Sequence, residues 1–535
     1  MNHRVTDPLG NIGTDGVSYA SGDDYGYFDD GGNDIYATMV LARWTGVTNE
    51  LPAMAYPSTY GIKPAASYDN QYAYANDSLH LENSYWISMS DPEAIKANII
   101  NCGSAATSIH YDDIYVNTAT GKKGAFYYNG TGSYTNNHAI SIVGWNNNYP
   151  KTNFLTQPAG NGAWLVKNSY GTSEGDAGYL WISYYDYGIT GTRDGDGDGN
   201  PDGNTAVFYD MASSTNYTNN YQYDGGVGTD YYQYTDGTAS MANVFTAKGF
   251  ENLGAVSFYT YDTNVGYTAK IYKLNANPTG PTDGTLMTTK TGTQLYEGYH
   301  TVKLDSPVTL SSGEKFSVVI DLVASGTDYA YVAIDYSGSL FSLQTYPYSY
   351  ATCNAGESYR SGDGTNWSQS SYNCRIKAFT TQATGVNVGY RTHVQNVGWQ
   401  SYVYNGATSG TAGQSLRLEG INVSLSSSVA GGIRYRTHVQ NIGWQDWVND
   451  GALSGTSAQS LRLEAIQIEL TGTVASTYDV YYRVQAQDYG WLGWTKNGAC
   501  AGTAGQGKRL EAIQIMVVPK GQAGPTPQYY SYVEY

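Results

Sequence analysis

Two side chains in the first third of the chain have the types and the setting that can activate a nucleophile. His138 begins an apolar stretch at residues 139–143, and Asn168 follows a second one at 164–166. An imidazole can act on a nucleophile only when another group fixes its tautomer and orientation, and an amide oxygen that accepts from the ring can do so. We therefore predict that His138 and Asn168 form half of a catalytic site.

The two strands that hold these residues are preceded by two predicted helices. Apolar residues spaced for one helical face predict a helix over 34–44 that ends at Gly46. A second helix is predicted over 92–101, capped by Asp91 or Ser90, because the proline that begins it suits a first helical turn. The two strands that carry His138 and Asn168 thus follow a helical segment.

The sequences around these residues resemble the papain-like cysteine peptidases. Residues 138–145, HAISIVGW, and 167–171, KNSYG, followed by GYLWISY, are similar to the motifs that carry the family's catalytic histidine and asparagine. GGN at 31–33, followed by the first predicted helix, resembles the segment after the family's nucleophile helix. The resemblance implies an α+β papain-like domain over 1–192, incomplete at its N-terminus.

The resemblance also implies a role for each residue. His138 would deprotonate a cysteine, Asn168 would orient the ring, and a peptide bond would be cleaved through a thioester, with no cofactor required for catalysis. The partner would be a protein or peptide substrate. The location would be extracellular or at the cell surface.

The nucleophile of that family should precede the Gly-Gly-Asn segment, and this sequence has no cysteine there. The glutamine that assists the oxyanion hole and an export signal are missing as well. Cys102, the only cysteine before His138, falls at the end of the second predicted helix, where the dipole disfavours a thiolate, so we expect an inert, packed thiol. N-terminal truncation would explain these absences together, and divergence into an inactive peptidase is the alternative. Either way, we expect this chain alone to show no thiol-dependent hydrolysis.

The composition of the chain limits its possible fold class and partners. With 535 residues, 64 glycines, 54 tyrosines and 14% charged residues, it is expected to form three or more turn-rich, mostly β domains. A net charge of −18 argues against nucleic acid and anionic membranes as partners. Apolar runs are too short for a transmembrane segment, and four cysteines are too few for a disulfide framework.

A linker at 193–204, RDGDGDGNPDGN, has the spacing of a calcium loop, D-x-D-x-D-G-x-x-D. Its candidate ligands are Asp194, Asp196, Asp198 and Asp202. The acidic residue that would complete a full site is replaced by Thr205. Calcium binding and a solvated acidic linker remain alternatives.

Residues 205–381 alternate between apolar and polar positions in short runs broken by turn residues, which predicts an all-β sandwich. Its place behind a papain-like domain resembles the lectin-like domain of surface peptidases from clostridia and related bacteria. We favour a disulfide between Cys353 and Cys374, and two buried thiols are the alternative.

A threefold repeat follows over 382–518, with units at about 386–425, 431–470 and 478–518, and a tail at 519–535. Their Gly-Trp pairs resemble clostridial hydrophobic repeats. The repeats predict an all-β array that closes as a prism or a trefoil. In the second unit, a change of phase between Ala465 and Ile466 predicts a β-bulge.

Two functions are compatible with this organisation. The first is a secreted or cell-surface cysteine peptidase, here without its cysteine. The alternative is a non-catalytic adhesin that binds cell-wall polysaccharide or glycan and uses the peptidase fold as a scaffold. In the repeats, Trp444 and Trp447 are expected to anchor the core and turns, and an aromatic sugar platform beside His393 or His438 is the weaker hypothesis.

Overall fold

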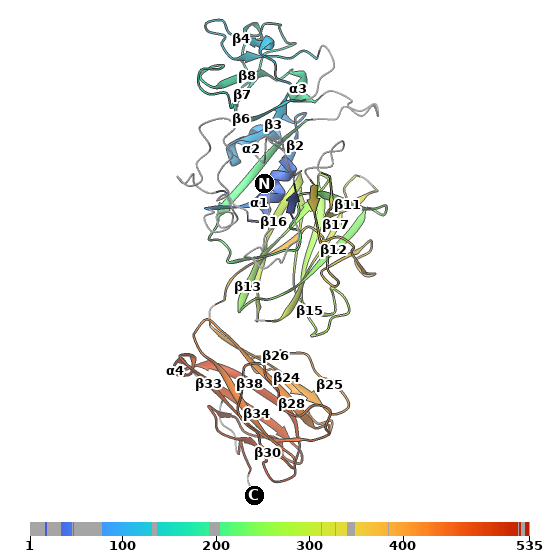
Figure 1. Cartoon of the computed structure of the whole chain (residues 1–535), viewed down its shortest axis with the longest axis vertical. Coiled ribbons are helices and arrows are strands. Elements are labelled where there is room, and N and C mark those ends of the chain that lie inside the picture. Colours follow the sequence, from blue (N-terminus) through green and yellow to red (C-terminus); the bar gives the residue numbers. More distant parts are fainter. Residues whose placement is uncertain are drawn as a thin grey trace.

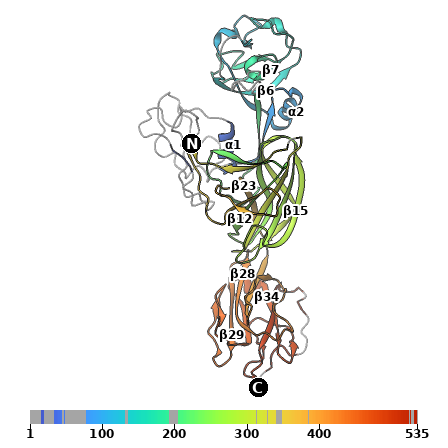
Figure 2. The same ribbon diagram turned by 90° about the vertical axis from the view of Figure 1, so that its right-hand side faces the viewer.

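The computed structural model describes residues 16–18, 34–44, 47, 78–130, 136–191, 204–311, 313–326, 328–339, 348–383, 385–522, 524–525 and 530–533. A papain-like part, a β-sandwich and a domain of three repeats follow one another along the long axis of the molecule (Figure 1). The side view shows the same succession (Figure 2). The predicted fold class is confirmed. Within the described residues, no helix is both long and apolar enough to cross a bilayer.

One sheet of twelve strands runs through the papain-like part and into the sandwich. Its order is β10 (Asn219–Tyr221), β23 (Ile376–Gln382), β13 (Glu251–Thr260), β16 (Glu297–Leu310), β2 (Leu79–Ser88), β9 (Thr205–Ser213), β3 (Ala105–Ile109), β6 (His138–Asn146), β7 (Ala163–Lys167), β8 (Tyr179–Ser183), β5 (Ala125–Phe126) and β4 (Val116–Asn117). Strand β2 connects the two parts, because it pairs with β9 along its whole length and with β16 at residues 84–86.

The helices of the papain-like part are α1 (Asp34–Ala42), α2 (Pro92–Cys102) and the single turn α3 (Tyr187–Thr190). In α2, the carboxylate of Asp91 accepts from the N–H of Ala94 at 3.0 Å, so the predicted cap is present. Gly103 ends the helix with a positive φ of 96°, and its N–H donates to the carbonyl of Ile99. The predicted stop of α1, Gly46, lies outside the described residues.

The papain-like part and the sandwich share a hydrophobic core. Met39 of α1, Trp86 of β2 and Val207 of β9 pack in one cluster with Tyr259 and Tyr299 of the sandwich strands. Strand β9, which our sequence boundary at 205 assigned to the sandwich, pairs with β2 and β3. The strand pairing therefore divides the two parts after β9.

A second sheet of the sandwich packs against this one, and the predicted period-two strands are divided between the two sheets and a separate ribbon. Its order is β15 (Gly284–Gln294), β14 (Val265–Leu274), β17 (Lys315–Val323), β12 (Thr238–Thr246), β21 (Ser358–Ser361) and β22 (Ser368–Gln369). A separate ribbon pairs β11 (Thr229–Tyr234) with β18 (Ala330–Asp335), and β1 (Gly16–Ser18), β20 (Tyr348–Tyr350) and β19 (Gly338–Ser339) form a small third sheet. Phe258 and Ile376 of the long sheet pack against Val318 and Ile320 of the facing sheet.

The disulfide that we favoured in the sandwich is not formed. Cys374 is a completely buried free thiol, and burial raises its pKa to about 12. Its Sγ donates to the carbonyl of Tyr359, whereas Cys353 donates to the carbonyl of Ser370. The two sulfur atoms thus have different hydrogen-bond acceptors, and the alternative of two thiols describes the structure.

The three repeats form a closed ring around one hydrophobic core. Each contributes a pair of long strands: β24 (Val386–Val394) with β28 (Leu418–Ser427), β29 (Gly432–Val439) with β33 (Leu463–Thr471), and β34 (Tyr478–Ala486) with β38 (Leu510–Pro519). Each pair borrows a short strand from the following unit: β32 (Ser454–Gly455) joins β28, β37 (Ala501–Gly502) joins β33, and β27 (Ser409–Gly410) joins β38. Three separate sheets around one core make a prism.

Shorter elements complete each unit. The Gly-Trp pairs form β25 (Gly398–Trp399), β30 (Gly443–Trp444) and β35 (Gly490–Trp491), and each is followed by one of β26 (Val403–Tyr404), β31 (Val448–Asn449) and β36 (Thr495–Lys496). A single helical turn, α4 (Val474–Thr477), connects the second unit to the third.

A buried tyrosine from each repeat links it to the preceding one. The hydroxyl of Tyr435 accepts from the N–H of Val423 at 2.9 Å, and Tyr482 accepts from Ile468 at 3.0 Å. Tyr390 of the first unit accepts from Ile515 of the third at 2.9 Å, so the ring closes. Because each bond satisfies buried groups of two units, the domain is expected to fold as one body.

The β-bulge in the second repeat lies at Glu464, not between Ala465 and Ile466 as predicted. His438 faces Ala465 and Val439 faces Leu463, which leaves Glu464 as the extra residue. Its buried carboxylate lies 2.8 Å from Arg462 and 3.1 Å from His438. A glutamate on the inner face was not predictable from alternation, because its burial depends on these two partners.

A buried ionic cluster holds the sandwich strand β23 against the loop before β11. The carboxylate of Asp224 lies 2.7 Å from Lys377 Nζ and 3.3 Å from Arg375 Nη1, and Arg375 also pairs with Asp335 at 3.2 Å. All four side chains are 3% exposed or less. Gln222 accepts from Lys377 and donates to the carbonyl of Arg43, so the cluster also reaches the end of α1.

We expect Asp224→Ala to lower the free energy of unfolding by about 4 kcal/mol, because the buried Lys377 loses its anion and the buried Arg375 keeps only Asp335. The measurement is chemical denaturation followed by tyrosine and tryptophan fluorescence. Asp305→Ala is the matched control, since its pair with Lys290 is exposed and should leave the midpoint unchanged. Equal midpoints for both variants would show that the cluster does not stabilise the fold.

A second buried carboxyl makes the papain-like part sensitive to pH. Asp186 is fully buried and accepts from the N–H groups of Tyr128 at 2.7 Å and Ile189 at 2.9 Å. Burial raises its pKa to about 7, although these N–H donors favour the charged form. Since the unfolded value is about 4, the stability tied to this proton is complete below that pH and is lost as the pH rises through 7.

We expect the unfolding midpoint of the unaltered chain to fall between pH 5 and pH 8 by more than that of Asp186→Asn, which cannot ionise. Parallel losses of stability in the two chains would show that Asp186 does not titrate in this range. Thermal unfolding across a pH series makes the comparison.

Candidate active site

The register of two strands brings His138 and Asn168 together. His138 is the first residue of β6 and lies opposite Ile109 of β3. Asn168 directly follows β7, which is antiparallel to β6. Because the start of one antiparallel strand lies beside the end of the next, two side chains 30 residues apart in sequence meet at one edge of the sheet.

The imidazole and the amide are joined by a short hydrogen bond. His138 Nε2 lies 2.8 Å from Asn168 Oδ1, which fixes Nε2 as the protonated nitrogen and leaves the lone pair on Nδ1. The same Oδ1 accepts from the N–H of Ser169 at 2.8 Å, and the N–H of Asn168 donates to the carbonyl of Gly178 at 3.0 Å. Asn168 is 9% exposed, so its amide is a fixed acceptor beside a half-buried ring.

Tyr170 covers the imidazole and was not singled out from the sequence. Its ring stacks on His138 with centroids 4.8 Å apart and planes 23° apart. Its hydroxyl lies 3.3 Å from His138 Nδ1, to which it can donate. The KNSYG motif contains Tyr170, so its position two residues after Asn168 was the available signal.

Tyr111 and Asn137 complete the support of the ring, and no sequence signal indicated them. Asn137 accepts from the N–H of Tyr111 at 2.8 Å and donates to its carbonyl at 3.1 Å. This places the Tyr111 ring 5.2 Å from the imidazole of His138 and 5.5 Å from Tyr170. The contact depends on pairing between β3 and β6, which the linear sequence does not reveal.

The amide of Asn168 has one unfilled position. Its Nδ2 is buried and has no hydrogen-bond partner among the described residues. Buried donors are seldom left unpaired, so an acceptor is expected there in the complete site. The pair is thus fixed on the side of Nε2, whereas the amide N–H of Asn168 has no acceptor among the described residues.

Cys102 lies where the sequence predicted, at the end of α2. It packs half-buried against the core of the papain-like part, and burial followed by the charge of Asp210 raises the pKa of its thiol. A raised pKa keeps the sulfur in its less nucleophilic thiol form at neutral pH. The geometry therefore fits the expected inert thiol.

The four aspartates of the predicted calcium loop, Asp194, Asp196, Asp198 and Asp202, lie outside the described residues. Among the residues that the structure does describe, no group of three or more histidine, cysteine, aspartate or glutamate side chains is arranged to hold a metal. Calcium at residues 193–204 therefore stays a prediction.

The tryptophan rings of the repeats make cation–π contacts with arginine side chains. The guanidinium of Arg436 lies 5.1 Å from the ring centroid of Trp444 and 4.9 Å from that of Trp447, and Arg483 lies between Trp491 and Trp494 in the same way. His438 meets Trp444 edge-on. A face occupied by a cation is not free to stack on a sugar, which favours the anchoring role.

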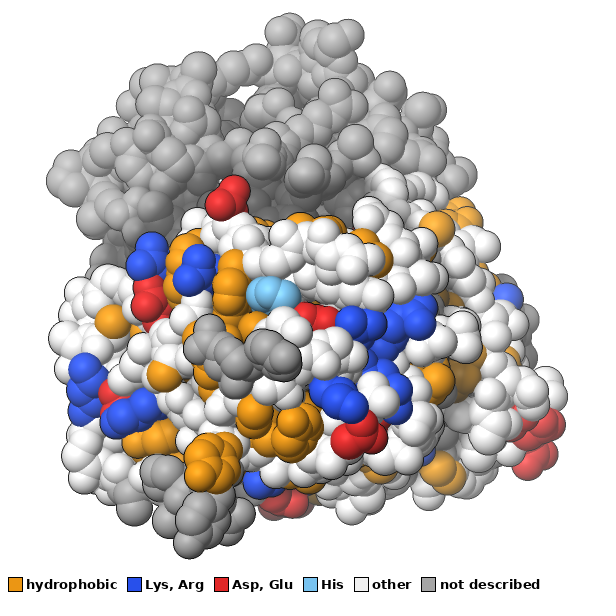
Figure 3. All heavy atoms as spheres, turned by 90° about the horizontal axis from the view of Figure 1, so that it is seen from below, with side chains coloured by type: hydrophobic (Ala, Val, Ile, Leu, Met, Phe, Trp, Pro, Cys, Tyr) orange, Lys and Arg blue, Asp and Glu red, His pale blue; other side chains and the backbone are white. Residues whose placement is uncertain are grey.

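Charges on the repeat domain are mixed. The face at the repeat end shows Lys and Arg side chains interspersed with acidic and apolar ones (Figure 3). Opposite charges so close together weaken each other's field.

Three family models match the chain in succession. The papain family cysteine protease model matches residues 28–193, the lectin-like domain model 220–380, and the clostridial hydrophobic W model 393–427, 438–472 and 485–519. His138 and Asn168 both fall inside the first match. No curated protein matches the chain in sequence.

Two solved structures share the fold of the first two parts. One is the clostridial cysteine protease Cwp84 after propeptide cleavage, with 24% identity, a TM-score of 0.53, and 68% of this chain and 86% of that chain covered. The other holds the cysteine protease and lectin-like domains of Cwp84, described as a surface layer associated protein of Clostridium difficile. It has 24% identity, a TM-score of 0.51, and covers 65% of this chain and 73% of that one.

We expect the proton on His138 Nε2 to be protected from exchange by the bond to Asn168, and to give a resolved downfield signal in proton NMR of histidine-labelled protein. Asn168→Ala should remove this signal, whereas Asn168→Asp keeps an acceptor and should retain it. Tyr170→Phe is the control at the other nitrogen and should also retain it. A signal that persists in Asn168→Ala would contradict the assigned bond.

Proposed function

We propose, because papain-family, lectin-like and clostridial hydrophobic W segments follow one another in this chain, that it is the peptidase-type part of a bacterial surface protein. In this proposal His138 and Asn168 form the imidazole and amide of thiol-dependent peptide hydrolysis. The observation that carries the proposal is the 2.8 Å bond from His138 Nε2 to Asn168 Oδ1, within the two matching motifs. Because this bond holds the ring proton on Nε2, Nδ1 is the basic nitrogen.

The reaction proceeds in two displacements. Nδ1 of His138 takes the proton of a cysteine thiol, and the thiolate forms a bond to the carbonyl carbon of the peptide. The peptide C–N bond breaks as the imidazolium returns the proton to the leaving amine. Water, deprotonated by the same nitrogen, then releases the acid and the thiol. Asn168 keeps the ring in one orientation throughout.

The cysteine of this reaction is proposed to come from outside the 535 residues. Cys102 packs at the end of α2 with a raised pKa. Cys353 and Cys374 lie in the sandwich, and Cys500 belongs to the third repeat. We therefore propose that this chain alone is inactive as a peptidase.

The proposed setting is the cell exterior, by similarity to a protein described as surface layer associated. A protein or peptide is the proposed substrate, and a cell-wall polysaccharide or other glycan is the proposed partner of the accessory domains. The acidic loop at 193–204 is proposed to bind calcium as a stiffened linker. No step of the hydrolysis depends on that ion.

A non-catalytic adhesin is the second candidate, and the position of Tyr170 favours it. Its hydroxyl lies 3.3 Å from His138 Nδ1, the nitrogen that would have to accept the proton of a thiol. If that contact persists when a cysteine is supplied, the imidazole is not available as a base. The papain-like part would then serve as a scaffold for glycan binding.

The decisive assay compares the chain with a chimera that carries the nucleophile segment of a papain-family relative fused ahead of Gly31. We expect no iodoacetamide-sensitive cleavage of casein by the chain alone, and clear cleavage by the chimera. In the chimera, His138→Ala should lower the rate about 10³-fold, because the general base is lost. Cys102→Ala should leave it unchanged.

Thiol-dependent cleavage by the unextended chain would contradict the proposed source of the cysteine. Cleavage by the chimera that survives His138→Ala would contradict the assigned base. A folded chimera without any cleavage would favour the adhesin.

A further inference from the structure

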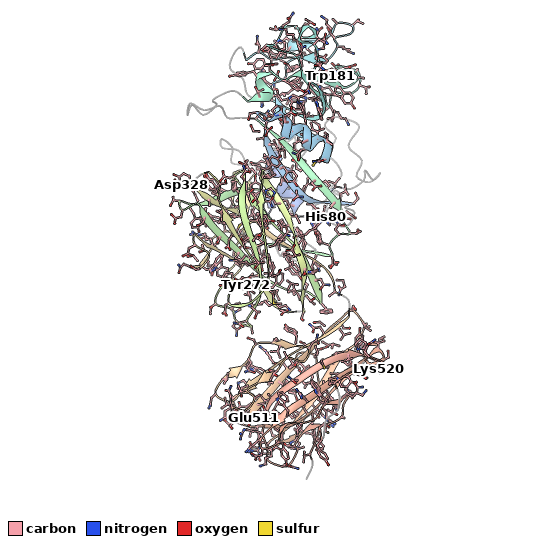
Figure 4. The ribbon with its side chains drawn as sticks, turned by 180° about the vertical axis from the view of Figure 1, so that it is seen from behind. His80, Trp181, Tyr272, Asp328, Glu511 and Lys520 are labelled. Atoms are coloured by element: carbon pink, nitrogen blue, oxygen red, sulfur yellow. The ribbon has the colours of Figure 1, made fainter. Side chains whose placement is uncertain are left out.

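Three tyrosines form an aromatic corner on the ribbon of β11 and β18. Val332 faces the core of the sandwich, so Tyr331 and Tyr231 lie on the opposite face of the ribbon. Tyr261, which follows β13, packs beside them. Asp328, just before β18, marks this outer side of the sandwich (Figure 4).

The three rings of the tyrosine corner stand at steep angles to one another. The ring centroids of Tyr231 and Tyr331 are 4.8 Å apart with their planes at 79°, and those of Tyr231 and Tyr261 are 5.1 Å apart at 64°. Tyr261 and Tyr331 complete the set at 6.3 Å and 67°. Tyr231 is 45% exposed, so the corner opens to solvent and offers the electron-rich face of an aromatic ring.

Three carboxylates lie close to this corner. After burial, the negative charges of Asp230 and Glu297 contribute to the raised pKa of Tyr261. In the same way, burial and then the charge of Asp262 raise the pKa of Tyr331. Because such effects weaken with distance, the carboxylates border the tyrosine corner.

These carboxylates are not neutralised within the protein. Among the residues that the structure describes, neither Asp262 nor Glu297 forms an ion pair. The cation whose charge reaches Tyr261 is Arg375, which is buried and already paired with Asp335 at 3.2 Å. The tyrosine corner therefore has a surplus of negative charge.

Glu297 is the carboxylate on which this surplus acts most clearly. Burial, and after it the charge of Asp262, raises the pKa of Glu297 to about 7, although the hydroxyl of Tyr259 donates to its Oε1 at 3.3 Å and favours the charged form. The side chain is half-buried, and Oε2, which has no partner among the described residues, keeps contact with solvent. A ligand can therefore reach this oxygen.

We propose that the tyrosine corner and its carboxylates bind a lysine or arginine side chain in a basic segment of a partner protein. A cation beside tyrosine rings gains a cation–π attraction, and a carboxylate adds a charge-assisted hydrogen bond. Charge complementarity selects this occupant, because a neutral sugar would leave the carboxylates without a cation and an acidic segment would be repelled. The site does not use the chemistry of His138, so it goes beyond the proposed function.

The test uses the full chain at pH 8, above the pKa of Glu297, and three probes: hexalysine, hexaglutamate and cellotetraose. Binding is measured by isothermal titration calorimetry at low salt. Glu297→Gln combined with Asp262→Asn removes two charges and keeps the side-chain shapes. The matched control, Asp305→Asn combined with Asp488→Asn, removes two charges from exposed side chains elsewhere. Tyr231→Ala removes a ring of the corner, and Tyr231→Phe keeps it.

We expect hexalysine to bind with a dissociation constant of about 0.1 mM or tighter. The Glu297 and Asp262 double variant should weaken binding at least about tenfold, since both carboxylates lose their charge. Tyr231→Ala should weaken it about threefold through the lost cation–π contact. Tyr231→Phe and the control double variant should bind as the unaltered chain does, and hexaglutamate and cellotetraose should not bind.

Three outcomes would overturn the inference, provided that circular dichroism shows each variant to be folded. Failure of hexalysine to bind to the unaltered chain would remove the site while leaving the proposed peptidase chemistry untouched. An equal loss of binding in the control double variant would show only the general attraction of a chain with a net charge of −18. Binding of cellotetraose that is lost in Tyr231→Ala would make the corner a sugar site instead.

Discussion

The constraint on which the structure depends is the double pairing of strand β2. One edge of β2 bonds to β9 and the papain-like strands, and the other bonds to β16 of the sandwich. A strand inside a sheet must satisfy the backbone groups of both edges, so the two parts cannot separate without breaking this ladder. The shared cluster around Trp86 and Tyr259 adds buried apolar area to the same junction. The papain-like part and the sandwich thus behave as one body.

The His138 and Asn168 pair is a consequence of that sheet. The β6 and β7 register sets the distance between the two side chains, and β3 sets the place of Tyr111 and, through Asn137, the wall beside the ring. The imidazole is oriented by Asn168 and covered by Tyr170, with the basic nitrogen turned away from the amide. In the proposed function a cysteine thiol would lie at Nδ1, and in the structure the hydroxyl of Tyr170 lies 3.3 Å from that nitrogen.

Sequence reasoning succeeded where a local pattern determines the outcome. The Asp91 cap, the alternation of the sandwich strands and the two family-like motifs each depend on neighbouring residues, and the repeat period predicted a closed array. It failed where contacts between distant segments determine the local structure. The place of β9 depends on its pairing with β2, the thiol of Cys374 on the carbonyl of Tyr359, and the bulge at Glu464 on ion pairs that no alternation pattern encodes. Tyr111 and Asn137 were missed for the same reason.

The central claim is that His138 is poised to ionise a thiol, and the pH dependence of thiol alkylation tests it most directly. In the chimera with a supplied nucleophile segment, the rate of reaction with iodoacetamide should rise at a pH well below the ordinary thiol value of about 8.5, because an imidazolium stabilises the thiolate. His138→Ala should move that rise back toward the ordinary value. The same profile with and without the imidazole would contradict the account.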